Sequence, residues 1–125
     1  MATNKLTNKR IEEIKNEILG KAYELSFVFV SRAKIKELNK KYRGKDEPTD
    51  ILSFPLESNG GEILICKEAA KEKFEEVWKG KYRTFENYLI FLVIHGCLHL
   101  KGLEHGSKME KYELSHYSRY RRRHL

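Results

Sequence analysis

Apolar residues are distributed along the chain in two patterns. In several segments they return at every third or fourth position, which is typical of a helix with one buried face. These segments predict helices over 7–19, 32–42, 67–78 and from 107 into the basic end of the chain. Elsewhere short apolar runs rich in β-branched and aromatic residues predict strands, over 25–30, 51–54 and 62–66.

Two segments are apolar on more than one face. The segment 84–100 is apolar nearly all round, so it predicts a central helix that is buried on all sides. The run 25–30 is apolar on both faces and predicts a buried strand. The turn signal at 59–61 makes the strands on either side of it a hairpin or near neighbours. Because strands and helices mix without strict β-α-β alternation, we expect an α+β fold, with a small mixed β-sheet covered by helices.

Polar and glycine residues predict where the helices begin and end. Ser31 and Thr84 are expected caps, and Gly44 and Gly102 are expected stops. The helix over 67–78 is expected to close at Gly80, with an inner face made of the residues at its helical repeat, Ala70, Phe74 and Val77.

The length and composition predict one globular domain spanning 1–125. The chain has 40% hydrophobic and 34% charged residues, which fits neither a disordered nor a membrane protein. No apolar run approaches the roughly 18 residues that a spanning helix needs. The polar N-terminal stretch lacks the apolar core of a secretion signal, so we expect a cytoplasmic protein with no membrane partner. Cys66 and Cys97 are isolated in sequence and are expected to be reduced and buried.

The chain is basic. It has 25 lysines and arginines against 18 acidic residues, and a formal net charge of +7. This balance favours a polyanionic partner such as nucleic acid. A basic proteome or a highly charged thermostable surface explains it equally well.

Three histidines fall within the segment HGCLHLKGLEH at 95–105. His95 and His99 are four residues apart, so they share one helix face. Gly102 can adopt the left-handed conformation that reverses the chain and brings His105 back toward them. Three imidazoles predict a metal site whose fourth position is open, which is typical of catalytic rather than structural sites.

The spacing equals that of the metzincin protease motif, with one difference. That motif carries its general base at the position occupied here by Gly96, so peptide hydrolysis by the same mechanism is disfavoured. Glu104 either orients a ligand or acts on water, or is a solvated loop carboxylate. His116 is expected on the surface, and His124 in the tail.

The histidine segment resembles the H-G-x-L-H-L-x-G-Y-D-H signature of the YbeY family, the rRNA maturation factors of bacteria. Two further stretches are similar to motifs of this family: YRGKDEPTDILSFP at 42–55, preceded by Leu38-Asn39, and GEILIC at 61–66. Here Glu62, Leu103 and Glu104 replace the Asp, Tyr and Asp of the family's motifs.

The resemblance implies a zinc-dependent, single-strand-specific endoribonuclease. It implies one Zn²⁺ per chain, held by His95, His99 and His105, and it adds Arg43 to these three as a catalytic residue. It also implies processing of the 16S rRNA 3′ end during ribosome maturation, with the rRNA precursor and the small ribosomal subunit as partners.

Several alternatives stay open from the residues themselves. Taken alone, Arg43 is a surface turn arginine, and a three-histidine site also accepts nickel, cobalt, iron or copper. The nucleophile is either water or the 2′-hydroxyl of the substrate. The RYRRR segment at 119–123 either binds the RNA backbone or complements the helix dipole. Rival functions are a metallohydrolase of another substrate class, such as a peptidase, and a ribosome-assembly factor whose zinc is mainly structural.

Overall fold

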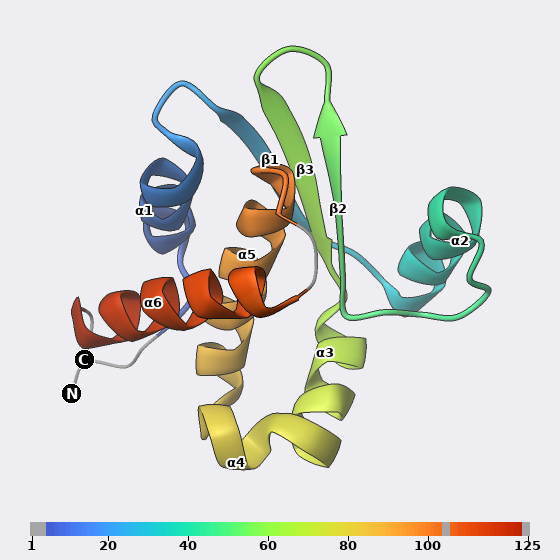
Figure 1. Cartoon of the computed structure of the whole chain (residues 1–125). Helices are drawn as coiled ribbons and strands as arrows, with labels where there is room; N and C mark the ends of the chain where they lie inside the picture. Colours follow the sequence, from blue (N-terminus) through green and yellow to red (C-terminus); the bar gives the residue numbers. More distant parts are fainter. Residues whose placement is uncertain (1–4, 104–105, 124–125) are drawn as a thin grey trace.

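A three-stranded sheet packs against a central helix, and further helices surround the two (Figure 1). The computed structural model describes residues 5–103 and 106–123. In the sheet, β3 (Gly60–Ile65) lies between the other two strands. β1 (Glu24–Phe29) runs parallel to β3, and β2 (Ile51–Leu56) forms an antiparallel hairpin with it. The predicted α+β fold with a small mixed sheet is confirmed.

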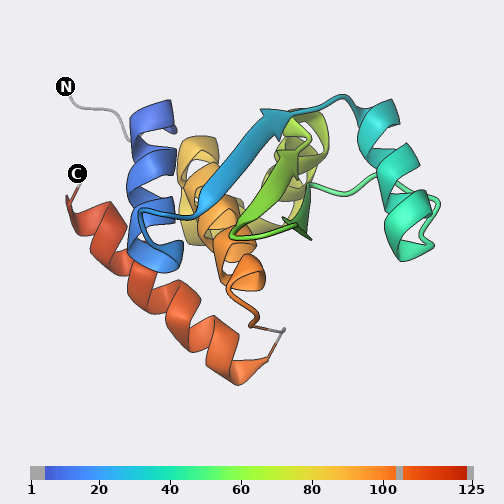
Figure 2. The same cartoon turned by 90° about the horizontal axis from the view of Figure 1, so that it is seen from above.

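The central helix is α5 (Phe85–Leu100), as the sequence predicts. The Thr84 side chain caps it by accepting a hydrogen bond from the Asn87 N–H at 3.1 Å, and Gly102 follows its end with φ of 104°. Helices α1 (Asn8–Leu19) and α6 (Ser107–Arg123) pack against α5, as the view from above shows (Figure 2). The two cysteines are free and buried, which confirms the expectation from their isolation.

The expectation that residues 25–30 form a buried strand is wrong. In the described part of the chain, β1 is an edge strand that pairs with β3 alone, while α5 packs mainly against β2 and β3. The side chains of Val28 and Phe29 are therefore 43% and 42% exposed. The apolar composition correctly predicts a strand but does not show that it lies at the edge of the sheet.

The segment 67–78 also differs from its prediction. It forms α3 (Lys67–Lys73), a π-helical turn η1 (Phe74–Trp78) and α4 (Lys79–Tyr82), so the helix continues past Gly80. A π turn adds one residue to the repeat. Consequently Val77, expected on the inner face, is 57% exposed, and Trp78 packs against the core in its place. The chain leaves α4 at Arg83, which has a positive φ of 71°.

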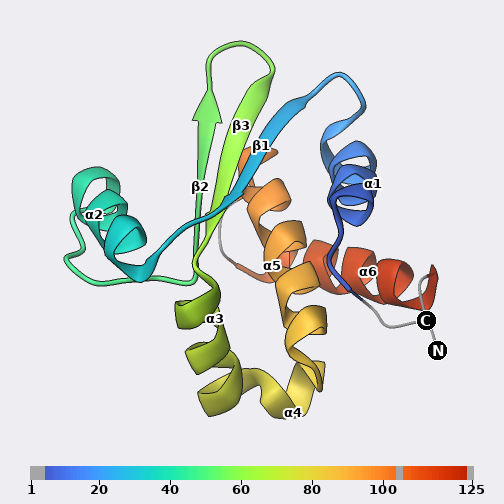
Figure 3. The ribbon, with the colours of Figure 1, turned by 180° about the vertical axis from the view of Figure 1, so that it is seen from behind.

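Helix α2 (Arg32–Arg43) stands away from the rest of the molecule (Figures 1 and 3). Ser31 caps its start, and Gly44, in the left-handed conformation with φ of 71°, follows its end. Its inner side packs through Ile35 onto Leu52 and Cys66, a small apolar cluster separate from the main core. Among the described residues, no helix combines the length and the apolar character needed to cross a membrane.

Candidate functional site

Two of the predicted metal ligands face each other on α5. The Nε2 atoms of His95 and His99 are 3.1 Å apart, and the ring planes are inclined at 81°. The spacing of four residues places both rings on one side of the helix, as predicted. A hydrogen bond between the two Nε2 atoms satisfies this geometry, and a cation bound by both would take the place of the shared proton.

Glu113 of α6 fixes the orientation of the His95 ring. The carboxylate of Glu113 accepts a hydrogen bond from Nδ1 of His95, and both side chains are largely buried. This contact places the proton on Nδ1 and directs Nε2 toward His99. Metal-binding histidines usually donate their other ring N–H to a carboxylate in this way, which holds the ring and makes it a better ligand.

The distance between the two histidines fits a shared metal ion. With Zn–N bonds of about 2.0–2.1 Å in a tetrahedral site, two ligand nitrogens are about 3.3 Å apart. The observed 3.1 Å between the Nε2 atoms is close to this value. Within 5–103 and 106–123, no cluster of three or more His, Cys, Asp or Glu side chains forms a metal site. The third expected ligand, His105, lies outside the described residues, as do Glu104 and His124.

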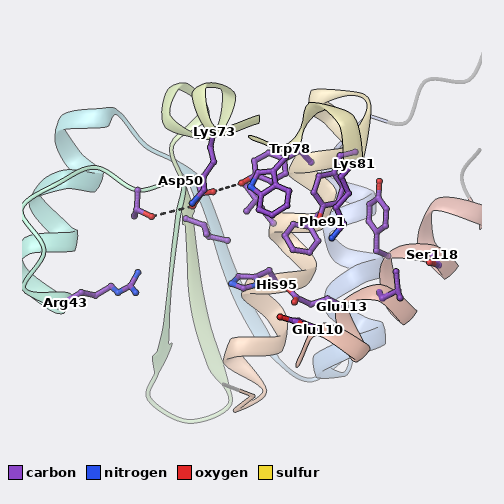
Figure 4. A pocket seen from close by; sticks show the side chains of 17 residues that line it. Arg43, Asp50, Lys73, Trp78, Lys81, Phe91, His95, Glu110, Glu113 and Ser118 are labelled. Carbon is purple, nitrogen blue, oxygen red and sulfur yellow. Dashed lines mark hydrogen bonds and ion pairs between the residues drawn. The ribbon is translucent and has the colours of Figure 1, made fainter. Parts of the chain in front are cut away.

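A cavity of about 830 Å³ opens beside His95 and brings Arg43 into the same site (Figure 4). Arg43 reaches it from the end of α2, where the left-handed Gly44 turns the chain. His95 and Glu113 line it from α5 and α6. The structure therefore places Arg43 and His95 on the walls of one cavity, although they are far apart in the sequence.

Asp50 lines the same cavity and is held from two sides. Its carboxylate accepts a hydrogen bond of 2.6 Å from the Tyr88 hydroxyl and one of 3.4 Å from Thr49. Burial, reinforced by the Asp50 carboxylate, raises the pKa of Tyr88 well above its usual value. Tyr88 thus stays protonated and remains a hydrogen-bond donor to Asp50 over the physiological pH range.

Gly96 lies on a different side of α5 from the histidines. It is buried against the sheet, and a Cβ at this position would be 2.9 Å from Cδ1 of Ile63 and 3.2 Å from Cδ1 of Ile51. A glutamate at position 96 would point into the β2–β3 hairpin rather than toward the cavity. The packing of α5 on the sheet thus accounts for the glycine where the protease motif carries its base.

Two side chains that line the cavity are missed by the sequence analysis. Glu113 is one, although it has a recognisable signal, because it lies on the buried face of α6 at four-residue spacing from Met109 and Tyr117. A carboxylate on an apolar helix face needs a partner. The other is Trp78, whose position depends on the π turn. His116, expected on the surface, has its ring largely buried, with Nδ1 3.5 Å from Glu17.

Comparison with known proteins tests the resemblance. The family model described as Endoribonuclease YbeY matches residues 1–122. The Endoribonuclease YbeY of Thermotoga neapolitana is 42% identical over 102 residues, which cover 81% of this chain and 65% of that protein. The Halalkalibacterium halodurans protein of the same name is 36% identical, with 87% and 82% covered. The chain thus spans somewhat less than two-thirds of the length of some relatives.

A solved structure agrees with these matches. The solution structure of TM1509 from Thermotoga maritima superposes with a TM-score of 0.62 at 34% identity, covering 90% of this chain and 77% of that one. The fold, the three motifs and the match along nearly the whole sequence lead to the same conclusion: the chain belongs to the Endoribonuclease YbeY family.

Proposed function

We propose that this protein is a metal-dependent endoribonuclease that cleaves single-stranded RNA and acts in the maturation of rRNA. The observation that carries the proposal is the His95–His99 pair, with Nε2 atoms 3.1 Å apart, at the edge of a cavity that Arg43 also lines. Membership of a family named for endoribonuclease activity supports the same reaction class. The net charge of +7 suits a polyanionic substrate in the cytoplasm.

We further propose that the metal is a single Zn²⁺. His95 and His99 would hold it, with His105 as the third ligand that the sequence motif predicts. When bound, the ion would supply Lewis-acid chemistry, stabilising charge on a phosphoryl oxygen and activating water. Imidazole nitrogens and an open fourth position suit this role. The hydrogen bond from Nδ1 of His95 to Glu113 leaves Nε2 of the neutral ring as the nitrogen that would bind the metal.

Arg43 is proposed to bind the scissile phosphate. A guanidinium offers a planar fork of donors that matches two phosphate oxygens and stabilises the charge that grows on them in the transition state. The side chain is exposed and lines the cavity, so an incoming phosphodiester can reach it. Asp50, held by the Tyr88 hydroxyl, lines the same cavity as Arg43 and His95.

The structure gives little support to a protease reading. The base of the protease motif would occupy position 96, which is packed on Ile63 and Ile51. Among the described residues, the carboxylates that line the cavity are those of Asp50, Glu110 and Glu113. Two of these are engaged, Asp50 with Tyr88 and Glu113 with His95.

The test is cleavage of end-labelled single-stranded and duplex RNA by the wild type, His99→Ala and His116→Ala. His116 is the matched control, because it lies on α6 against Glu17 and does not line the cavity. We expect single-strand cleavage by the wild type and His116→Ala, its loss in His99→Ala, and loss on chelation with recovery on adding Zn²⁺. Equal cleavage by all three proteins, or by none, would overturn the proposal.

A second substrate pair tests the role in rRNA maturation. A transcript carrying the precursor 3′ end of 16S rRNA is compared with an unrelated single strand of equal length. We expect cleavage at defined positions in the precursor, and the same kcat/KM on both substrates would remove the rRNA assignment while leaving the nuclease assignment intact.

A further inference from the structure

The cavity beside the histidines has two chemically different ends (Figure 4). At one end lie His95, the proposed metal ligand, and Glu113, its hydrogen-bond partner. At the other end stand Lys73, Trp78 and Lys81, which have no part in that assignment. The labelled carboxylate nearest to these three residues in this view is that of Asp50, which accepts hydrogen bonds from Tyr88 and Thr49.

The π turn is what brings Trp78 to the cavity. A regular α-helix continued from Ala70 and Phe74 would place position 77 on the inner face, but the extra residue of η1 moves position 78 there. Trp78 is half-buried, and its ring packs near that of Tyr82 with centroids 6.1 Å apart. π turns within helices occur frequently at functional sites.

A continuous series of rings connects this end to the histidines. Tyr82 lies 4.9 Å from Phe91, and Phe91 lies 5.8 Å from His95, measured between ring centroids. Of the rings in this wall, those of Trp78 and Phe91 are partly exposed and open to a base, while Tyr82 between them is buried. Such a wall stacks well with unpaired bases, since every base has a flat face to offer.

The lysines supply positive charge at the same end. The Nζ of Lys81 is 5.6 Å from the centroid of the Trp78 ring and 5.5 Å from that of Tyr82. Lys73 and Lys81 are both exposed, so each can turn its ammonium group toward an anion without leaving a buried position. Flexible ammonium groups can bind the phosphate of a nucleotide, and the half-buried ring of Trp78 beside them can stack with its base.

We propose that Lys73, Trp78 and Lys81 form a subsite for an unpaired nucleotide of the RNA, with its base stacked on Trp78 and its phosphates held by the two lysines. The inference rests on the proposed function, because it places a flanking nucleotide of the same strand whose scissile phosphate lies between Arg43 and His95. It also gives a physical reason for single-strand preference, since a base inside a duplex cannot stack on a protein ring.

Trp78 is the single tryptophan of the chain, so its fluorescence reports directly on this subsite. The probe is a short, unstructured oligonucleotide with 2′-O-methyl riboses, checked to remain intact during titration of the metal-loaded protein. The comparison is an abasic oligomer of equal length and charge. We expect saturable quenching by the first and little by the second. Equal quenching by both would overturn the stacking proposal.

Variants provide an independent test through the anisotropy of a labelled oligonucleotide. Trp78→Ala should weaken binding about 10-fold, within the range found when one stacking residue is lost, whereas Trp78→Phe should retain most of the affinity. Val77→Ala is the matched control, because Val77 belongs to the same turn and is exposed. Equal binding by Trp78→Ala and Val77→Ala would contradict the subsite.

Kinetics separate the subsite from the chemistry. Stacking held equally in the ground and transition states raises KM when removed and leaves kcat unchanged. We expect this for Trp78→Ala, with unchanged metal content. Base-dependent quenching without RNA cleavage by the wild type would support the subsite and overturn the proposed function. Cleavage without quenching would support the proposed function and overturn the subsite.

Discussion

The cavity joins two regions that are held in different ways, the histidine pair on α5 and the arginine at the end of α2. His95 and His99 sit on a helix that is buried along most of its length, and Glu113 fixes the ring of His95 from α6. Arg43 ends a helix that stands apart and rests on a small apolar cluster (Figure 3).

The difference indicates which half of the site is preorganised, the histidine half (His95, His99 and Glu113) or the arginine half (Arg43). Ligands for a metal ion need donor atoms fixed to a few tenths of an ångström, and buried packing provides this. A residue that receives a flexible, charged substrate gains from solvent access. Asn39 limits the freedom of this half, because its buried side-chain amide donates to the Glu47 carbonyl at 2.8 Å and secures the loop that leads from Arg43 to Asp50.

The largest effect is expected at Arg43. Arg43→Ala should lower kcat about 100- to 1,000-fold, the usual result of removing a donor that stabilises transition-state charge. The bound metal and the melting temperature should not change, because the side chain is exposed. Lys36→Ala is the matched control, a lost cation on the exposed face of the same helix that does not line the cavity. Loss of metal in Arg43→Ala would show that the two halves are not independent.

Glu113→Gln should weaken metal binding by about 10- to 100-fold, as is typical when the partner of a ligating histidine is changed. The glutamine keeps the shape of the side chain but removes the charge that orients His95. Zinc affinity is measured by competition with a chromogenic chelator. Glu110→Gln is the control, since Glu110 lines the same cavity and is exposed. If both variants bind zinc equally, the Glu113 carboxylate does not preorganise His95 for metal binding.

Packing of α5 on the sheet is tested at Gly96. Gly96→Ala adds a methyl group 2.9 Å from Ile63 and should lower the free energy of unfolding by about 1–3 kcal/mol. Gly80→Ala is the matched control in α4, where a Cβ meets no atom within 4 Å. It should raise stability by about 0.4–1 kcal/mol. Urea denaturation measures both, and equal stabilities would mean that the contact between α5 and the sheet can relax freely.

These sites also show what the sequence could predict. Facing histidines follow from a spacing of four in an apolar helix, and helix ends follow from residues such as Thr84 and Gly44, because both depend on local geometry. The partner of His95 depends on how α6 is rotated against α5, which local spacing does not determine. The position of Trp78 depends on a π turn, which breaks the repeat used to assign inner faces.

Topology sets a similar limit. The apolar run 25–30 is a strand, but the number of its neighbours depends on the order β1-β3-β2, which arises from pairings across the chain. The metal, the role of Arg43 and the ligand His105 remain predictions. For Arg43 the structure adds its place in the cavity of His95, which residue spacing alone could not provide.

The smallest perturbation uses the two cysteines, because each reports on one region. Cys97 is buried in α5, and burial raises its pKa to about 12. Cys66 belongs to the small cluster beneath α2. If α2 opens locally, a thiol reagent should label Cys66 at least about 10-fold faster than Cys97 under native conditions. Labelling of the variants Cys66→Ala and Cys97→Ala shows which cysteine reacts in the fast phase and which in the slow phase.

The pH dependence of labelling distinguishes local opening from global unfolding. A raised pKa means that the folded protein keeps Cys97 protonated at pH values where an unfolded thiol, with a pKa of about 8.5, is already ionised. Raising the pH from neutral to about 8.5 should therefore not make Cys97 reactive within the folded state. Its labelling should instead follow global unfolding. In urea both thiols should react at once. Equal native rates for Cys66 and Cys97 would mean that α2 and α5 unfold as one unit, and the contrast between a fixed histidine half and a looser arginine half would then fail.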